Sequence, residues 1–265
     1  MTEPRNGYGT ADDEVELERR RLAHLATARD PKTFALLERV GVTTDWHCLE
    51  VGAGAGTVSA WLAERVGTGG RVMSTDVDTR FHAEPAANVI LREADIVHDA
   101  FPAAHFDLVH ARAVLQHIPE RREVLAKLVG LLKPGGWMVI EDGHFGLFAD
   151  QPLPEPYQTI HTIIASASQD EWRDPSVGAR LLAWMREEGL TDLDVVGDVW
   201  AMRPGEDGGE WWFLALERAG PRLVEAGVVT DEAFSAAMAQ VRAPDFVMLS
   251  TTSLAVLGRR PATPA

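Results

Sequence analysis

The feature that most constrains this chain is a short apolar run that ends in closely spaced glycines. Residues 46–51, with the sequence WHCLEV, are typical of a buried parallel strand, and Gly52, Gly54 and Gly56 follow at once. Beyond the last glycine, apolar side chains recur at helical intervals. The sequence therefore predicts a strand, a glycine turn and a helix, an arrangement in which a ligand can approach backbone N–H groups without meeting a Cβ.

Strand-like and helix-like segments alternate beyond this turn. Compact apolar runs bounded by charged or turn residues predict further strands. These runs cover residues 71–76, 88–93, 106–110, 137–140, 193–200 and 246–258. Before 137–140, a helical pattern ends at Lys133-Pro134-Gly135-Gly136, where proline stops the helix. Such alternation implies helices on both faces of a parallel sheet, so we expect an α/β fold with a doubly wound, mainly parallel, seven-stranded sheet.

Further helices and connections surround the predicted sheet. Residues 14–40 carry apolar side chains at helical intervals, and Pro31 divides them into two predicted helices. The proline-rich stretch 151–156 must be a connection. Of two later helices, one ends at Gly189 and the other begins at Thr230, a residue suited to cap it.

We expect all 265 residues to form one domain. Residues 1–44 would supply N-terminal helices that act as a lid, and residues 45–142 the ligand-binding core. Residues 143–190 would form a cap and a helix. Residues 191–265 would supply the last strands and helices.

Charge and composition narrow the function classes. A formal net charge of −15 disfavours a phosphate backbone as ligand, so nucleic acid is not an expected substrate. No apolar stretch approaches the ~20 residues of a membrane span, and the polar N-terminus lacks the pattern of a signal peptide. Cys48 is the only cysteine, which suits a reducing compartment. We therefore expect a cytoplasmic protein without membrane contact, either a monomer or a homodimer.

The glycine turn by itself has more than one interpretation. Glycines also serve tight turns in proteins that bind nothing there. A dinucleotide-binding turn would follow G-x-G-x-x-G/A, but Thr57 occupies the sixth position counted from Gly52. With Glu50 at the strand end, the run instead resembles the first motif, E/D-x-G-x-G-x-G, of class I S-adenosylmethionine (SAM) dependent methyltransferases. This resemblance implies a Rossmann-like methyltransferase fold, with SAM as cofactor and S-adenosylhomocysteine as product.

Downstream segments extend the resemblance across residues 46–142. Asp76 ends the second strand, where the family places an acidic residue that accepts both ribose hydroxyls, and Asp78 is a rival assignment. Asp95 and its neighbour match the third motif, which holds the adenine, although a surface carboxylate beside a core isoleucine would look the same. The cofactor-binding residues implied by the resemblance are Glu50, Gly52, Ala53, Gly54, Asp76, Val77, Asp95, Ile96 and Ala111. Glu50 would orient the glycine turn or the methionine amino group.

Two further segments bear on the acceptor. Gln116-His117-Ile118-Pro119 resembles the H-x-P segment of methyltransferases that act on small molecules. Residues 110–113 read HARA and so lack the Asn/Asp-Pro-Pro-Tyr/Phe motif of amino-group methylation on nucleic acid bases and peptides. We therefore expect methyl transfer to a small organic, natural-product-like acceptor of bacterial specialised metabolism, with O-methylation favoured. The alternatives are a SAM-binding protein that catalyses a cyclisation or rearrangement, an NAD-dependent oxidoreductase, and a catalytically silent partner subunit.

Histidines are the candidate catalytic residues, because a general base helps a hydroxyl acceptor lose its proton. His144 and His117 each follow the carboxyl end of a central strand, where ligands bind in such sheets, and His144 is preferred. His144 could equally bond a backbone carbonyl, and His117 could cap a helix or hold the methionine part of SAM. No metal is expected, because H-x-x-x-H and H-E-x-x-H are absent. A Mg²⁺ site at Asp99, Glu141 and Asp142 is the lesser alternative.

The acceptor pocket is expected beneath the insertion from Phe145 to Trp172, which would fold over the strand ends together with the N-terminal helices. Aromatic residues with a polar tip suit a mostly apolar metabolite. The residues expected to line this pocket are Tyr8, Phe145, Tyr157, His161 and Trp172. Core packing or a dimer surface is the alternative explanation for them.

Overall fold

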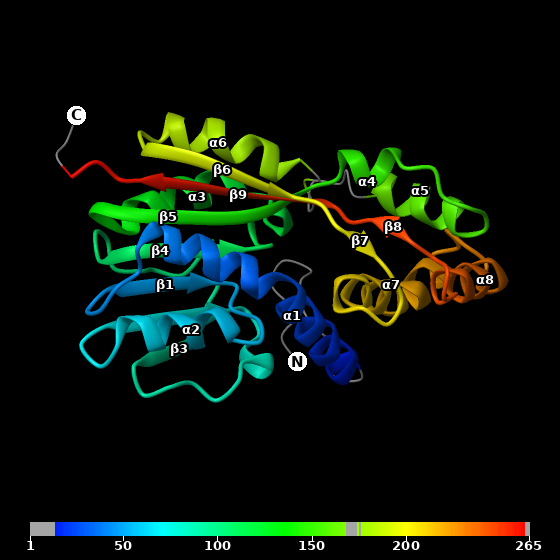
Figure 1. Ribbon diagram of the computed structural model, residues 1–265, viewed down its shortest axis with the longest axis horizontal. Coiled ribbons are helices and arrows are strands. Elements are labelled where there is room, and N and C mark those ends of the chain that lie inside the picture. Colours follow the sequence, from blue (N-terminus) through cyan, green and yellow to red (C-terminus); the bar gives the residue numbers. More distant parts are fainter. Residues whose placement is uncertain (1–13, 168–173, 175, 263–265) are drawn as a thin grey trace.

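The computed structural model describes residues 14–167, 174 and 176–262. Its centre is a seven-stranded sheet in the order β3-β2-β1-β4-β5-β9-β6 (Figure 1). The strands are β1 (His47–Val51), β2 (Arg71–Asp76), β3 (Val89–Glu93), β4 (Phe106–Arg112), β5 (Leu132–His144), β6 (Thr191–Asp198) and β9 (Thr252–Arg259). Strand β9 is antiparallel to β5 and β6, and the other pairs are parallel. The structure therefore confirms the expected doubly wound, mainly parallel sheet.

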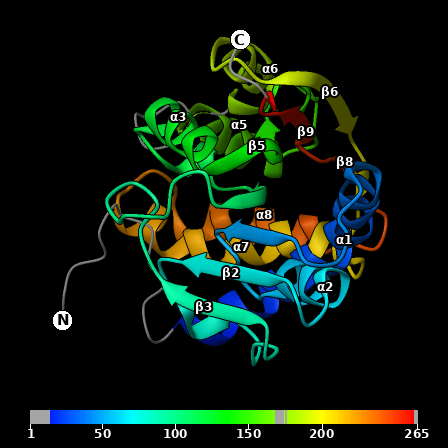
Figure 2. The ribbon, with the colours of Figure 1, turned by 90° about the vertical axis from the view of Figure 1, so that its left-hand side faces the viewer.

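Four helices cover the two faces of this sheet. They are α1 (Val15–Val40), α2 (Thr57–Val66), α3 (Arg121–Leu131) and α6 (Val177–Glu187). Leu37 of α1 and Leu62 of α2 are fully buried in one hydrophobic core, and Leu125 of α3 and Leu181 of α6 in another. Figure 2 shows α1 and α2 on one side of the strands and α3 on the other. Since both faces are covered, the central strands are continuous apolar runs rather than alternating ones.

A helical cap lies beyond the carboxyl ends of the parallel strands (Figure 1). It contains α4 (Gly146–Asp150), α5 (Tyr157–Ala167), α7 (Asp207–Glu225), α8 (Asp231–Val241) and a small antiparallel pair, β7 (Ala201–Met202) with β8 (Met248–Leu249). Its own core is aromatic and includes Phe148, Tyr157, Trp212 and Phe213. Two separate stretches of chain therefore build the cap. Within the described residues, no helix is both long and apolar enough to cross a membrane.

The prediction that Pro31 divides the first helical segment is wrong, because α1 continues through it. A proline inside a helix removes one backbone hydrogen bond and costs about 3 kcal/mol. Side chains on either side of the proline are held by the sheet: Arg112 donates to Asp30 Oδ1 (2.8 Å) and to Thr33 Oγ1 (2.9 Å). These buried contacts keep the two turns in line, and a sequence pattern does not reveal them.

Two other elements differ from the sequence prediction. The expected strand 246–258 is two strands, β8 and β9, with a break at Ser250, which exchanges two hydrogen bonds with the backbone of Trp200. Phe246 lies in the cap core instead. Helix α7 was not predicted at all, since Gly208, Gly209 and Pro221 obscure its helical pattern.

The predicted helix ends are confirmed in two places. Gly189 follows α6 with a φ of 78°, the left-handed conformation that glycine adopts without strain. Thr230 caps α8, since its Oγ1 accepts a hydrogen bond from the backbone N–H of Ala233 at 3.2 Å. Glycine and short polar residues mark helix ends through their local chemistry, so both ends could be predicted from the sequence.

Candidate active site

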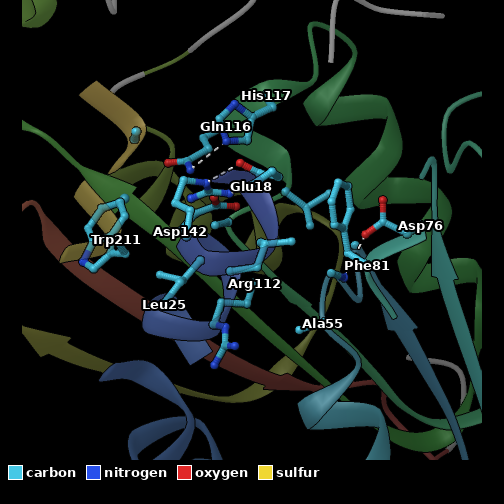
Figure 3. Close-up of a pocket in the computed structure, with 18 of the residues that line it drawn as sticks. Glu18, Leu25, Ala55, Asp76, Phe81, Arg112, Gln116, His117, Asp142 and Trp211 are labelled. Carbon is cyan, nitrogen blue, oxygen red and sulfur yellow. Dashed lines mark hydrogen bonds and ion pairs between the residues drawn. The ribbon is translucent and has the colours of Figure 1, made fainter. Parts of the chain in front are cut away.

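A cavity of about 510 Å³ lies among the carboxyl ends of the parallel strands, helix α1 and the cap. It lies at the ends of β1 and β4, and the connections that follow these two strands run to opposite sides of the sheet. Ligands bind at such a point in open α/β folds. Figure 3 shows Ala55, Asp76 and Phe81 towards one end of it, Trp211 towards the other, and Gln116, His117 and Asp142 on the wall between them.

The glycine turn forms the floor at one end. Gly52 and Gly54 have positive φ angles of 69° and 53°, which L-residues adopt only with strain. A Cβ on Gly52 would overlap the Cγ2 atom of Val114. The backbone N–H groups of Gly52 and Ala53 donate to Thr75 O (2.8 and 3.0 Å), which ties the turn to β2. The turn thus presents bare backbone to the cavity at a position where a side chain does not fit.

Asp76 stands beside the turn at the end of β2. Its Oδ2 accepts from Gly54 N at 2.8 Å and its Oδ1 from Asp78 N at 3.1 Å. Burial raises the pKa of the Asp76 carboxyl, against the opposing effect of these hydrogen bonds. Each oxygen keeps a lone pair for a further donor. Asp78 also borders the cavity, but it forms an ion pair with Arg80 (2.7 Å), so Asp76 is the better acceptor for a ligand.

Asp95 and Ile96 lie on the wall next to Asp76. Asp95 Oδ1 accepts from the backbone N–H of Val97 at 2.8 Å, which holds the carboxyl in place. Ile96 is 5% exposed and joins the hydrophobic core behind it. Together they pair a carboxylate acceptor with an apolar surface, a combination suited to a flat heteroaromatic ring that carries an amino group.

Behind the cavity, a fully buried histidine bridges two buried glutamates. His110 Nδ1 lies 2.6 Å from Glu50 Oε2, and its Nε2 lies 3.0 Å from Glu141 Oε1. Carboxylates only accept hydrogen bonds, so both ring nitrogens donate and the ring is an imidazolium. Burial alone would lower the pKa of His110, but the charge of Glu50 and hydrogen bonds to both carboxylates raise it to about 9. The Glu50 side chain is therefore paired with His110 and does not line the cavity.

The same cluster reaches helix α1 through Glu141. This carboxylate accepts from Thr33 Oγ1 at 2.7 Å and from Arg29 Nη2 at 3.4 Å. Burial would raise the pKa of Glu141, but the hydrogen bond and charge of His110, with the charges of Arg112 and Arg29, lower it to about 2. Helix α1 is thus attached to β1, β4 and β5 by ionised groups that are almost fully buried.

A second charged cluster attaches α1 to the cap. Glu18, only 4% exposed, accepts from both Arg21 (2.7 Å) and Arg218 of α7 (2.6 Å). Glu18, Arg21 and Arg218 border the cavity, so the contact of α1 with α7 forms one of its walls. The cap side of the cavity is therefore enclosed by two segments that lie far apart in sequence.

The carboxyl ends of β4 and β5 supply polar groups to the cavity wall. Gln116 Nε2 lies 3.1 Å from His117 Nε2, in the short helix η4 (Leu115–His117). Asp142 of β5 accepts from Leu115 N at 3.1 Å through its Oδ2. Burial raises the pKa of the Asp142 carboxyl to about 7. This wall thus holds a carboxyl that titrates near neutral pH.

The structure separates the other candidate residues into two groups. His117 and Phe145 line the cavity, as do Gly52, Ala53, Gly54, Asp76, Val77, Asp95 and Ile96. His144 does not, and its Nδ1 accepts from the backbone N–H of Gly146 at 3.3 Å. Ala111 is buried within β4. Tyr157 and His161 are fully buried inside the cap, away from the cavity. Tyr8 and Trp172 lie outside the described residues.

Sequence reasoning missed several residues that build this site. Asp142 was considered only as a lesser metal ligand, and His110 was given no role. Arg29, Arg112 and Trp211 also line the cavity. An ionisable residue inside an apolar strand pattern is a signal that could have singled out His110 and Asp142. The described residues contain no group of three or more His, Cys, Asp or Glu side chains placed to hold a metal ion.

Comparison with known proteins gives concordant results. Residues 49–140 match the family model described as a methyltransferase domain. Methyltransferase GfsG of Streptomyces halstedii is 32% identical over 128 residues, which cover 44% of this chain and 45% of that protein. Nocamycin O-methyltransferase of Saccharothrix syringae is 35% identical over 134 residues, 48% of this chain and 45% of that one. The matched region thus spans about half the length of these relatives.

Among solved structures, the chain resembles phosphoethanolamine N-methyltransferase 2 of Haemonchus contortus, with a TM-score of 0.54. That structure is a complex with phosphomonomethylethanolamine and S-adenosylhomocysteine. The match covers 88% of this chain and 53% of that protein at 21% identity. At this identity the likeness establishes the fold alone.

Proposed function

We propose that this chain, which belongs to the class I SAM-dependent methyltransferase family, transfers a methyl group from SAM to a small organic acceptor. One observation carries the proposal: a single cavity extends from the glycine turn and Asp76 to the apolar cap. A bound cofactor and an acceptor would share that enclosed space, as direct transfer between them requires.

The residues present fit SAM. A Cβ on Gly54 would meet only Leu22 Cδ2, at 3.5 Å, so the backbone there is open to the cavity and a ligand can approach it closely. Asp76 has lone pairs for the two ribose hydroxyls, and Asp95 with Ile96 suits the adenine. When bound, SAM supplies a methyl group already activated by a sulfonium.

The chain's own contribution is alignment and exclusion of water. Helices α1 and α7 close over the cavity, and the Glu18 cluster joins them. For a hydroxyl acceptor, His117 is the histidine that borders the cavity, so we propose it, rather than His144, as the general base. The likeness to an O-methyltransferase named for nocamycin supports oxygen as the nucleophile and an acceptor of natural-product type.

Calorimetry with S-adenosylhomocysteine tests the cofactor site. We expect saturable binding by wild type and a loss of about 100-fold or more in affinity for Asp76→Ala, since hydrogen bonds to a charged group contribute about 1.5–3 kcal/mol each. Asp78→Ala is the matched control, because that neighbouring carboxylate is already paired with Arg80. It should bind within about threefold of wild type.

Other results would change the assignment. If folded wild type binds NAD and not S-adenosylhomocysteine, the methyltransferase proposal fails in favour of an oxidoreductase. If it binds neither, a silent partner subunit is the better description. Binding of SAM without release of S-adenosylhomocysteine while a small molecule is converted would indicate a cyclisation or rearrangement.

A further inference from the structure

The charged side chains on the cavity wall are divided between its two sides. Helices α1 and α7 contribute four arginines and one acid to the described part of the wall, namely Arg21, Arg29, Arg218, Arg222 and Glu18. The rest of the wall contributes one arginine and five acids, namely Arg112, Asp76, Asp78, Asp95, Glu141 and Asp142. Although the chain has a net charge of −15, the helical side of the cavity is therefore basic and favours an anionic ligand.

Arg218 is the arginine on this wall with the most unused donors. Within the described part of the chain, each of the other four arginines donates at least two hydrogen bonds to protein side chains. Arg218 donates one, from its Nη1 to Glu18 Oε2 at 2.6 Å. Since a guanidinium has five N–H donors, most of those of Arg218 have no partner among the described residues.

These remaining donors are accessible. The Arg218 side chain is 23% exposed, and neither its Nε nor its Nη2 is among the described atoms that are buried without a partner. Nε–H and one N–H of Nη2 lie along the same edge of a guanidinium, where they match the two oxygens of a carboxylate. Arg21 binds Glu18 through this pair of atoms, at 2.7 Å each. The same edge of Arg218 is thus available to a carboxylate of a ligand.

Glu18 fixes the position of the Arg218 guanidinium. The Glu18 side chain is buried, and it holds Nη1 of Arg218 at the wall of the cavity. Figure 3 shows Glu18 between Asp76 and Trp211, which lie towards opposite ends of the cavity. Because the guanidinium is already held, little side-chain freedom is lost when an anion binds to it.

The neighbouring part of α7 is apolar. Trp211, Ala215 and Ala219 recur every four residues and border the cavity, so they lie along one face of the helix. The two alanines leave room for a ligand beside the helix. Trp211 and Arg218 are two helical turns apart, or about 10 Å along the axis. This spacing suits an elongated apolar molecule with an anionic group at one end.

Resting on the proposed function, we infer that Arg218 binds a carboxylate of the methyl acceptor, whose apolar body extends along α7 towards Trp211. The acceptor class is therefore an elongated, mostly apolar organic acid. A carboxylate is also present in the methionine part of SAM, so the experiment must separate these two sources of the same group.

A matched pair of probes tests this specificity. Biphenyl-4-carboxylate and biphenyl-4-carboxamide share their length and shape and differ in charge. With S-adenosylhomocysteine at saturation, we expect wild type to bind the carboxylate about tenfold more tightly by calorimetry, as a charge-assisted hydrogen bond implies. Arg218→Met should reduce this preference to about threefold or less, because both the charge and the fork are lost.

Two further variants show that the fork of Arg218 is responsible. Arg218→Lys keeps the charge and can still pair with Glu18, but it lacks the paired donors, so its preference should lie between those of wild type and Arg218→Met. It also serves as the test if Arg218→Met does not fold. Arg186→Met removes one positive charge from an exposed position on α6, outside the cavity, and should keep the full preference.

Titrations with the cofactor product identify the source of the carboxylate. If the acceptor supplies it, Arg218→Met should bind S-adenosylhomocysteine within about threefold of wild type. A loss of about tenfold or more, with unchanged affinity for 5′-methylthioadenosine, which lacks the amino-acid part, would assign Arg218 to the cofactor and overturn its role toward the acceptor.

The same titrations separate this inference from the proposed function. Equal binding of the two biphenyls by wild type, binding of neither, or an unchanged preference in both Arg218 variants overturns the role of Arg218, even if S-adenosylhomocysteine binds. Failure of S-adenosylhomocysteine to bind, with the preference for the carboxylate intact in its absence, overturns the methyltransferase proposal and leaves Arg218 as an anion-binding residue.

Discussion

Replacing His110 by alanine is expected to lower the free energy of unfolding by about 3–5 kcal/mol at neutral pH, because it leaves an uncompensated buried charge. His110 is fully buried and is the cation between Glu50 and Glu141, each 2% exposed. Without the ring, two carboxylates face an empty space that water enters poorly. Urea denaturation of wild type and variant measures the difference directly.

The pH profile of wild type should carry the signature of the same residue. The folded-state pKa of His110, about 9, lies above the unfolded value of about 6.5. Its contribution to stability is therefore fully present below about pH 6.5 and is lost as the pH rises through about 9. The profile of His110→Ala should lack this decline.

His105→Ala is the control, since that histidine is exposed at the start of β4. It should change stability by no more than about 0.5 kcal/mol. A loss below about 1 kcal/mol in His110→Ala, or a variant that retains the decline above pH 7, would contradict a buried imidazolium between two carboxylates.

Replacing Gly52 by alanine is expected to weaken S-adenosylhomocysteine binding strongly. Gly52 has a φ of 69°, and a Cβ there would overlap Val114 on the cavity wall. Backbone strain alone costs about 1–3 kcal/mol. With the displacement of Val114 added, we expect an affinity loss of about 100-fold or more by calorimetry.

Two further variants test this prediction: a matched control, and a double variant that removes the overlap with Val114. Gly130 lies in α3 with open space around its Cα, so Gly130→Ala should be neutral or stabilising by up to about 1 kcal/mol. Val114→Ala combined with Gly52→Ala removes the overlap but not the strain, and should restore part of the affinity. Normal binding by Gly52→Ala alone would show that the ligand does not approach this turn.

Much of the fold could be predicted from the sequence because its signals are local. The turn after β1 needs glycine where φ is positive, so Gly52 and Gly54 mark it within a few residues. Gly189 and Thr230 mark helix ends in the same way. Buried parallel strands are apolar throughout, and the alternation of strands with helices then sets the sheet topology.

Part of the candidate site was also accessible to sequence reasoning. The resemblance to the methyltransferase motifs implied that Asp76 and Asp95 lie near the turn, without knowledge of any contact. The structure places both on the cavity wall. Its place after the carboxyl end of a strand also selected His144, but that place does not decide which side chains reach the cavity, and His144 does not border it.

The sequence by itself thus determined the sheet and the glycine turn, because each depends on residues within one element or on the order of the strands. Tertiary structure alone decided the rest. His110 meets Glu50 and Glu141 across 60 and 31 residues of chain, and α7, far from the glycine turn in sequence, lines the other end of the cavity. Burial of charge and the pairing of distant side chains exist only in the folded molecule, because they depend on the exclusion of water by packing.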